Sequence, residues 1–88
     1  MKSVMFYEMA TNSGPMLREH FPAHRARLLE FQARGLVLMA GAFADTSQGA
    51  MGIFTSPEAA EEFMAGDPFV IHDLVANRRV WDWKEGLT

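Results

Sequence analysis

One histidine lies among apolar residues in a segment that the sequence predicts to be helical. Leu17, Phe21, Leu28 and Phe31 recur at helical spacing, and His24 fills the middle position of this stripe. Imidazole has an unperturbed pKa of about 6.5, so a histidine that faces a covered surface is suited to proton transfer near neutral pH. The alternative is a hydrogen-bonded histidine that only packs in the core.

The other chemistry-bearing side chains favour no competing reaction. The chain has no cysteine, which excludes a thiolate nucleophile, a disulfide and a cysteine-ligated metal. His72 and Asp73 are neighbours without the spacing of a metal site. Ser47 and Ser56 lack the context of a nucleophilic serine, and no glycine pattern matches a phosphate-binding loop. We therefore expect neither a metal nor an organic cofactor.

The elements that position His24 follow from apolar periodicity and from turn-forming residues. The predicted strands are 2–9 as a central strand, 36–43 as a buried strand, 50–55 and 74–84, with 45–49 as a hairpin connection. The predicted helices run from about Met16 to Arg34, from Pro57 after the N-cap Ser56 to about Ala65, and as a short turn or helix from Asp67 to His72. Pro22 is expected either to open the main helix or to kink a longer one.

This order, β-α-β-β-α-β, predicts an α+β fold of the ferredoxin-like or split βαβ type. Such a fold has an antiparallel four-stranded sheet with two helices on one face. The 88 residues are expected to form a single domain, 1–88. Apolar residues on both faces of the first two strands, together with Trp81 and Trp83 on one face of the last, suggest that the open sheet face packs against a second copy in a homodimer.

The composition limits the kinds of partner that the chain is expected to bind. The net charge of -3 and the pI near 5.5 argue against a nucleic-acid surface, which needs clustered Lys and Arg. No segment approaches the roughly 20 apolar residues that a membrane span requires, and nothing resembles a signal peptide. We expect a cytoplasmic protein whose partners are a small-molecule ligand and a second copy of the chain.

Three motifs make the sequence resemble the YciI (YCII-related) family. They are Pro22–Leu28 in the first helix, Gly35–Gly41 in the second strand and Gly66–Val70 after the second helix, and with the element order the likeness covers nearly the whole chain. The resemblance implies a ferredoxin-like dimer related to the dimeric α+β barrels, with an active site of one histidine and one aspartate. In this sequence these fall on His24 and Asp67.

The residues also supply a structural reason for Asp67, because Asp followed by Pro is a common helix N-cap. Capping and orienting an imidazole are compatible, since a carboxylate has two oxygens. For substrate binding we expect Gly41 to keep space open, Phe69 to line the site beside Asp67, and Asp45 either to line the mouth or only to form a turn. Where several relatives carry an arginine, this chain has Phe21, which implies a less charged ligand or a pocket without catalysis.

Two hypotheses follow. In the first, His24 acts as a general base or acid, oriented by Asp67, in the isomerisation or elimination of a small organic compound without a cofactor. The resemblance favours ring compounds, because a relative is a dehydrochlorinase of a chlorinated hydroxyhydroquinone and muconolactone isomerases are distantly similar. In the second, the chain is a non-catalytic dimeric module that binds a small ligand or a partner protein.

Overall fold

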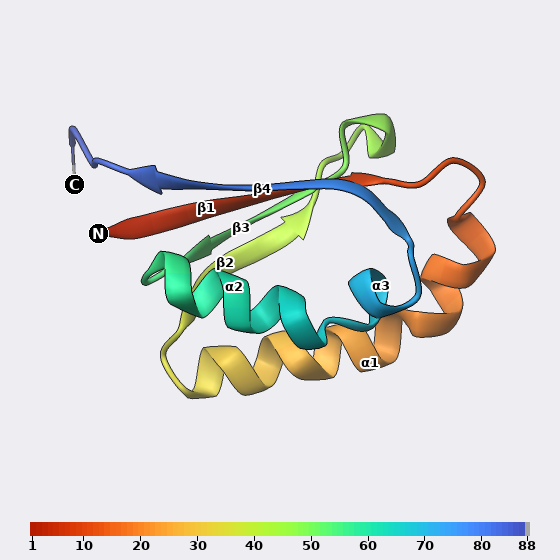
Figure 1. Ribbon diagram of the computed structural model, residues 1–88, viewed down its shortest axis with the longest axis horizontal. Helices are drawn as coiled ribbons and strands as arrows, with labels where there is room; N and C mark the ends of the chain where they lie inside the picture. The colour runs from red at the N-terminus through yellow and green to blue at the C-terminus, as the bar shows by residue number, and fades with distance from the viewer. Residues whose placement is uncertain (88) are drawn as a thin grey trace.

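The fold is a single antiparallel sheet with its helices on one side, shown in the computed structural model, which describes residues 1–87 (Figure 1). The strands β1 (Lys2–Met9), β2 (Val37–Ala42), β3 (Ala50–Phe54) and β4 (Val75–Trp83) pair in the order β2-β3-β1-β4. The helices are α1 (Gly14–Ala33), α2 (Pro57–Gly66) and α3 (Pro68–Ile71), with a 3-10 turn η1 (Thr46–Gln48). The ferredoxin-like prediction is confirmed, and β1 is a central strand.

The core lies between the sheet and the helices. Met5 and Tyr7 of β1 point to this side, where they pack with Phe54, Phe63 and Phe31. The rings of Phe31 and Phe63 meet edge to face at 5.4 Å, which ties α1 to α2. Each fully buried Phe contributes about 2 to 3 kcal/mol of hydrophobic free energy, so this cluster fixes how both helices sit on the sheet.

The second strand differs from its prediction. We expected a buried strand over 36–43, but β2 is an edge strand and only Val37 of it is buried. Ala42 pairs with Ala50, which in turn pairs with Tyr7, so Ala42 faces the helix side and is nevertheless exposed. One face of β2 is open and the other is only partly covered by α1, so the continuous apolar run does not mark a buried strand here.

Helix α1 begins two residues before the predicted start and contains Pro22 in its interior, so the alternative in which Pro22 opens the main helix is wrong and the longer helix is the one observed. Proline has no backbone N–H, so the hydrogen bond from position 22 to the carbonyl one turn earlier is missing. The turn is held by the neighbouring residues instead. The apolar stripe is also less continuous than predicted: Phe31 is 1% exposed but Phe21 is 51% exposed. Leu17 and His24 on either side are half-buried, so Phe21 interrupts the covered stripe.

The remaining elements begin and end within one residue of their predictions. The connection between β2 and β3 contains η1, and Gly49 closes it with φ 83°. A Cβ at Gly49 would lie 1.9 Å from the Tyr7 carbonyl oxygen, so only glycine allows this loop to cross β1 so closely. Within residues 1–87, no helix has the length and apolar character needed to cross a bilayer.

Candidate active site

Asp67 lies at the junction of α2 and α3, where its side chain is completely buried. Its Oδ1 accepts the N–H of Phe69 at 3.2 Å, which caps α3, and Pro68 takes the first helical position that needs no donor. A buried carboxylate is costly unless its oxygens are hydrogen-bonded. The N-cap alone leaves most of its acceptor capacity free for other donors.

Tyr7 fills part of that capacity from the centre of the sheet. Its hydroxyl donates to Asp67 Oδ2 at 2.7 Å. Burial, with the adjacent carboxylate as a further cause, raises the pKa of the Tyr7 hydroxyl far above its usual range, so this group stays a neutral donor. The sequence analysis did not identify Tyr7 as a site residue. The available signal was a lone tyrosine on the covered face of a central strand, where a buried hydroxyl needs a partner.

His24 supplies another donor to the same carboxylate. Its Nδ1 lies 2.7 Å from Asp67 Oδ1. The ring stacks on Phe69, with centroids 3.9 Å apart and planes 8° apart, and meets the edge of Phe63 at 5.9 Å. Two aromatic rings and one hydrogen bond therefore fix the position and the rotation of the imidazole.

The contacts also determine which nitrogen is available for chemistry. An ionised carboxylate can only accept, so Nδ1 donates to Asp67 and Nε2 of the neutral ring carries the lone pair. No group in residues 1–87 hydrogen-bonds Nε2. Every side-chain nitrogen or oxygen of these residues that is buried from solvent does have a hydrogen-bond partner. Nε2 therefore keeps contact with solvent, on a side chain that is 13% exposed.

Arg27 holds α2 in the position on α1 that places Asp67 opposite His24. Its Nε donates to the Phe63 carbonyl at 3.0 Å and its Nη2 to the Glu62 carbonyl at 2.7 Å, near the end of α2. The guanidinium fills the space beside Gly66, where a Cβ would lie 2.5 Å from the Arg27 Cζ. A larger residue at position 66 would displace the arginine or the chain just before Asp67.

The structure separates the other three predicted site residues from one another. Phe69 is buried against the His24 ring, so it supports the imidazole and is only 6% exposed. Asp45 is exposed and accepts from the backbone N–H and hydroxyl of Ser47, as a turn residue does. Gly41 pairs with Met51 and so belongs to the open face, whereas His24 lies on the covered side. Gly41 thus does not keep space open beside His24.

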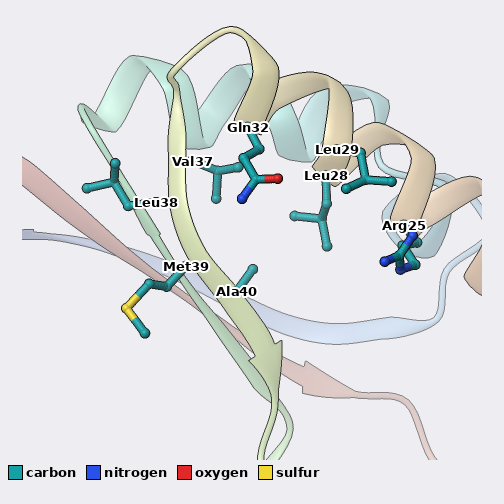
Figure 2. A pocket seen from close by; sticks show the side chains of 8 residues that line it. All are labelled: Arg25, Leu28, Leu29, Gln32, Val37, Leu38, Met39 and Ala40. Carbon is teal, nitrogen blue, oxygen red and sulfur yellow. The ribbon is translucent and has the colours of Figure 1, made fainter.

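Two surface hollows flank β2. The first, of about 180 Å³, lies between α1 and β2 and is lined by Arg25, Leu28, Leu29, Gln32 and residues 37–40 (Figure 2). The second, of about 290 Å³, lies over the open face of β2 and β3 and includes Gly41. Neither of these two hollows includes His24 or Asp67.

The other histidines form a separate contact. The rings of His20 and His72 stack at 3.9 Å where α1 meets the end of α3. Among residues 1–87, no group of three His, Asp or Glu side chains is arranged to hold a metal ion. The pair adds to the packing between α1 and α3, on which the position of Asp67 depends.

The fold and its sequence together define the class of the protein. The YCII-related domain family matches residues 1–84, so the chain belongs to this family. No curated protein matches the chain.

A solved structure shares the fold. It is the 5-chloro-2-hydroxyhydroquinone dehydrochlorinase TftG of Burkholderia phenoliruptrix, in complex with 2,5-dihydroxybenzoquinone. The two chains are 23% identical, the TM-score is 0.81, and the match covers 98% of this chain and 96% of that one.

Proposed function

We propose that this protein catalyses proton transfer on a small ring compound, with His24 as the general base and Asp67 as the group that orients it. The observation that carries the proposal is the 2.7 Å contact between His24 Nδ1 and Asp67 Oδ1, with Nε2 bonded by no group of residues 1–87 and in contact with solvent. A base must reach its substrate and hold a defined tautomer, and this arrangement provides both.

The step needs no cofactor. Nε2 takes a proton from a carbon next to an activating carbonyl, and the C–H electron pair becomes a new double bond. In an elimination, a leaving group such as chloride departs with its bonding electrons from the adjacent carbon. In an isomerisation, the imidazolium returns the proton to a different carbon. Asp67 stabilises the imidazolium between these events, as the carboxylate of a catalytic triad does.

The substrate class is supported by the family and by the structural relative. TftG is a dehydrochlorinase of a hydroxylated ring and its structure holds a dihydroxybenzoquinone. Both molecules are single six-membered rings, and base-catalysed elimination or isomerisation is chemistry that a buried His and Asp pair can support. For this chain we infer a ring compound of similar size.

We also propose that two copies pack through the open sheet face. Met39, Trp81 and Trp83 belong to this face and are 68%, 57% and 44% exposed. Such a patch is unusual on a monomer, and aromatic residues are typical of the centre of an interface.

The test follows proton abstraction directly. The protein is incubated in deuterium oxide with unsaturated lactones and with chlorinated hydroxyhydroquinones, and NMR records carbon-bound deuterium while chloride release is measured separately. We expect His24→Gln to lower the exchange rate about 100-fold or more, within the usual range for loss of a general base. His20→Gln is the matched control, because His20 lies one turn away and contacts His72 instead of Asp67.

A non-catalytic ligand-binding module is the second candidate. It is favoured by the hollows, because neither of the two beside β2 includes His24. This candidate predicts ligand binding with no deuterium exchange in wild type. Exchange that persists unchanged in His24→Gln would also contradict the proposed role of the imidazole.

A further inference from the structure

The hollow between α1 and β2 contains a cation that nothing in the described chain neutralises. Arg25 lines it, and within residues 1–87 Arg25 makes no ion pair and no hydrogen bond. The other lining residues are apolar apart from Gln32, and no carboxylate is among them. By contrast, Arg27 and Arg34 on the same helix are engaged with α2. Arg25 is thus available to an anion from outside the chain.

The geometry of α1 places this cation beside the proposed base. Leu28 comes four residues after His24 and three after Arg25, so its side chain lies on the helix face between theirs. Residues at these spacings have Cβ atoms about 5 to 6 Å apart. Figure 2 shows Leu28 and Gln32 extending from α1 into the hollow, with Arg25 at one end and Ala40 on the facing strand. Leu28, which lines the hollow, is therefore the neighbour on α1 of both Arg25 and His24.

The size of the hollow limits what it can hold. Its volume is about 180 Å³, well below the roughly 300 to 1,000 Å³ of sites for drug-sized molecules. Leu29, Leu38 and Met39 on its rim are 46%, 44% and 68% exposed, so one side is open to solvent. One six-membered ring with small substituents fills this space, and the small side chain of Ala40 leaves room for its plane.

We propose that Arg25 binds the negatively charged oxygen of a single-ring carboxylate or phenolate whose ring lies on Leu28, and that this anion is the substrate class of the site. The claim that this anion is a substrate rests on the proposed function. The guanidinium presents a planar pair of donors that matches a carboxylate, whereas Leu28 and Ala40 cover the ring. Arg25 is a specificity-determining residue because a neutral ring gains only the apolar contacts.

The binding experiment compares an acid with its neutral isostere. Protein NMR titrations use 4-hydroxybenzoate and 4-hydroxybenzamide. We expect the acid to shift the amides of Leu28, Gln32 and Ala40, with a dissociation constant on the order of 1 mM. The amide should bind about tenfold more weakly, and Arg25→Gln should lower the affinity for the acid about tenfold without changing that for the amide.

Arg18→Gln is the matched control, because it removes one positive charge from α1 outside the hollow. The proposal is overturned if acid and amide bind equally, if Arg25→Gln and Arg18→Gln weaken the acid equally, if the shifts lie only on the open sheet face, or if neither probe binds up to about 10 mM.

A third variant separates this inference from the proposed function. His24→Gln should bind 4-hydroxybenzoate as wild type does while losing deuterium exchange. Anion binding that depends on Arg25 without any exchange supports the anion site and removes the proposed catalysis. Exchange on anionic rings at the same rate in Arg25→Gln as in wild type supports the catalysis and removes the anion site.

Discussion

The two faces of the sheet differ in the side chains that they bury and expose. On the covered face, Ser3 and Asp67 are completely buried and Tyr7 nearly so, yet each polar side chain has a partner. On the open face, Phe6 and Trp81 meet at 5.4 Å, and Trp81 remains 57% exposed. The covered face thus buries a few polar groups within an apolar core, whereas the open face leaves large apolar groups exposed.

The difference shows where specificity lies in this fold. A buried carboxylate tolerates only a matched set of donors, so Tyr7, His24 and Phe69 define one arrangement around Asp67. Apolar contacts on the open face are non-directional and can be made by any complementary surface. We therefore expect substitutions on the covered face to change chemistry and folding, and those on the open face to change assembly.

The largest effect is expected at Asp67. Asp67→Ala removes the α3 cap and leaves the buried Tyr7 hydroxyl without a partner, so the free energy of unfolding should fall by about 3 kcal/mol. Asp67→Asn keeps an acceptor of the same shape and should lower stability less, while still removing the charge that stabilises an imidazolium. Urea unfolding measures the first effect and deuterium exchange the second. An unchanged urea midpoint in Asp67→Ala would break the comparison between the faces.

The next effect concerns the open face. In the proposed homodimer, Trp81→Glu places a charge in the interface and should weaken association about 30-fold, or about 2 kcal/mol, as for an aromatic hot spot. Light scattering over a dilution series measures this, and circular dichroism should show the same fold. Ile71→Glu is the matched control, because Ile71 is 58% exposed on α3, away from the open face. A wild-type protein that stays monomeric at every concentration contradicts the prediction.

Alkaline pH should destabilise the covered face through Tyr7. The pKa of its hydroxyl is raised in the folded state by burial and by Asp67, so the folded protein retains this proton longer than the unfolded chain does. Its contribution is complete below the unfolded pKa of about 10 and falls as pH rises, by about 1.4 kcal/mol at about pH 11.

Two readouts isolate this group. Tyr7 is the only tyrosine in the chain, so phenolate absorbance reports it alone. Ionisation should coincide with unfolding, and Tyr7→Phe should show a flatter loss of stability above pH 10 than wild type. Phenolate that forms near pH 10 while the protein stays folded would show that the hydroxyl is not held as described.

The smallest effect is expected at Asp45, the exposed counterpart of Asp67. Both cap a short helix, but Asp45 is exposed and accepts from the backbone N–H and hydroxyl of Ser47. These bonds hold the pKa of its carboxyl below the usual value, so its small stabilisation is present above the unfolded pKa and disappears as pH falls through the folded one. Asp45→Asn should therefore change the urea midpoint less than Asp67→Asn, with the difference from wild type confined to pH values above about 4.

The sequence predicted the fold well because local signals agreed with one another. Alternation marked β1, and Ser56 with Pro57 marked the start of α2, where Ser56 Oγ accepts the Ala59 N–H at 3.1 Å. The prediction of a buried second strand was wrong because a continuous apolar run has the same appearance in a central strand and in an edge strand beside a bare face. Phe21 was wrongly included in the covered stripe of α1 because periodicity alone does not tell which positions a neighbouring element covers.

Only part of the candidate site could be predicted from the sequence. His24 stood out by its spacing, and Asp67 came from the family motif; the structure brings these two side chains within 2.7 Å. Tyr7 was missed because its partner is 60 residues away and no local pattern links them. Gly41 was expected to keep space open at the site, but strand pairing puts it on the open face, away from His24. Pairing decides which face each strand residue takes, and a shift of one residue reverses it.

The network around Asp67 joins segments that are remote along the polypeptide, since His24 and Asp67 are 43 positions apart. Closing such long loops costs entropy that is recovered only when the contacts at both ends have formed. During synthesis the imidazole therefore emerges well before the group that orients it. Any activity that depends on this imidazole begins only after residues beyond Asp67 have left the ribosome and β1 has found its partners, so turnover would report completed folding rather than the mere presence of the chain.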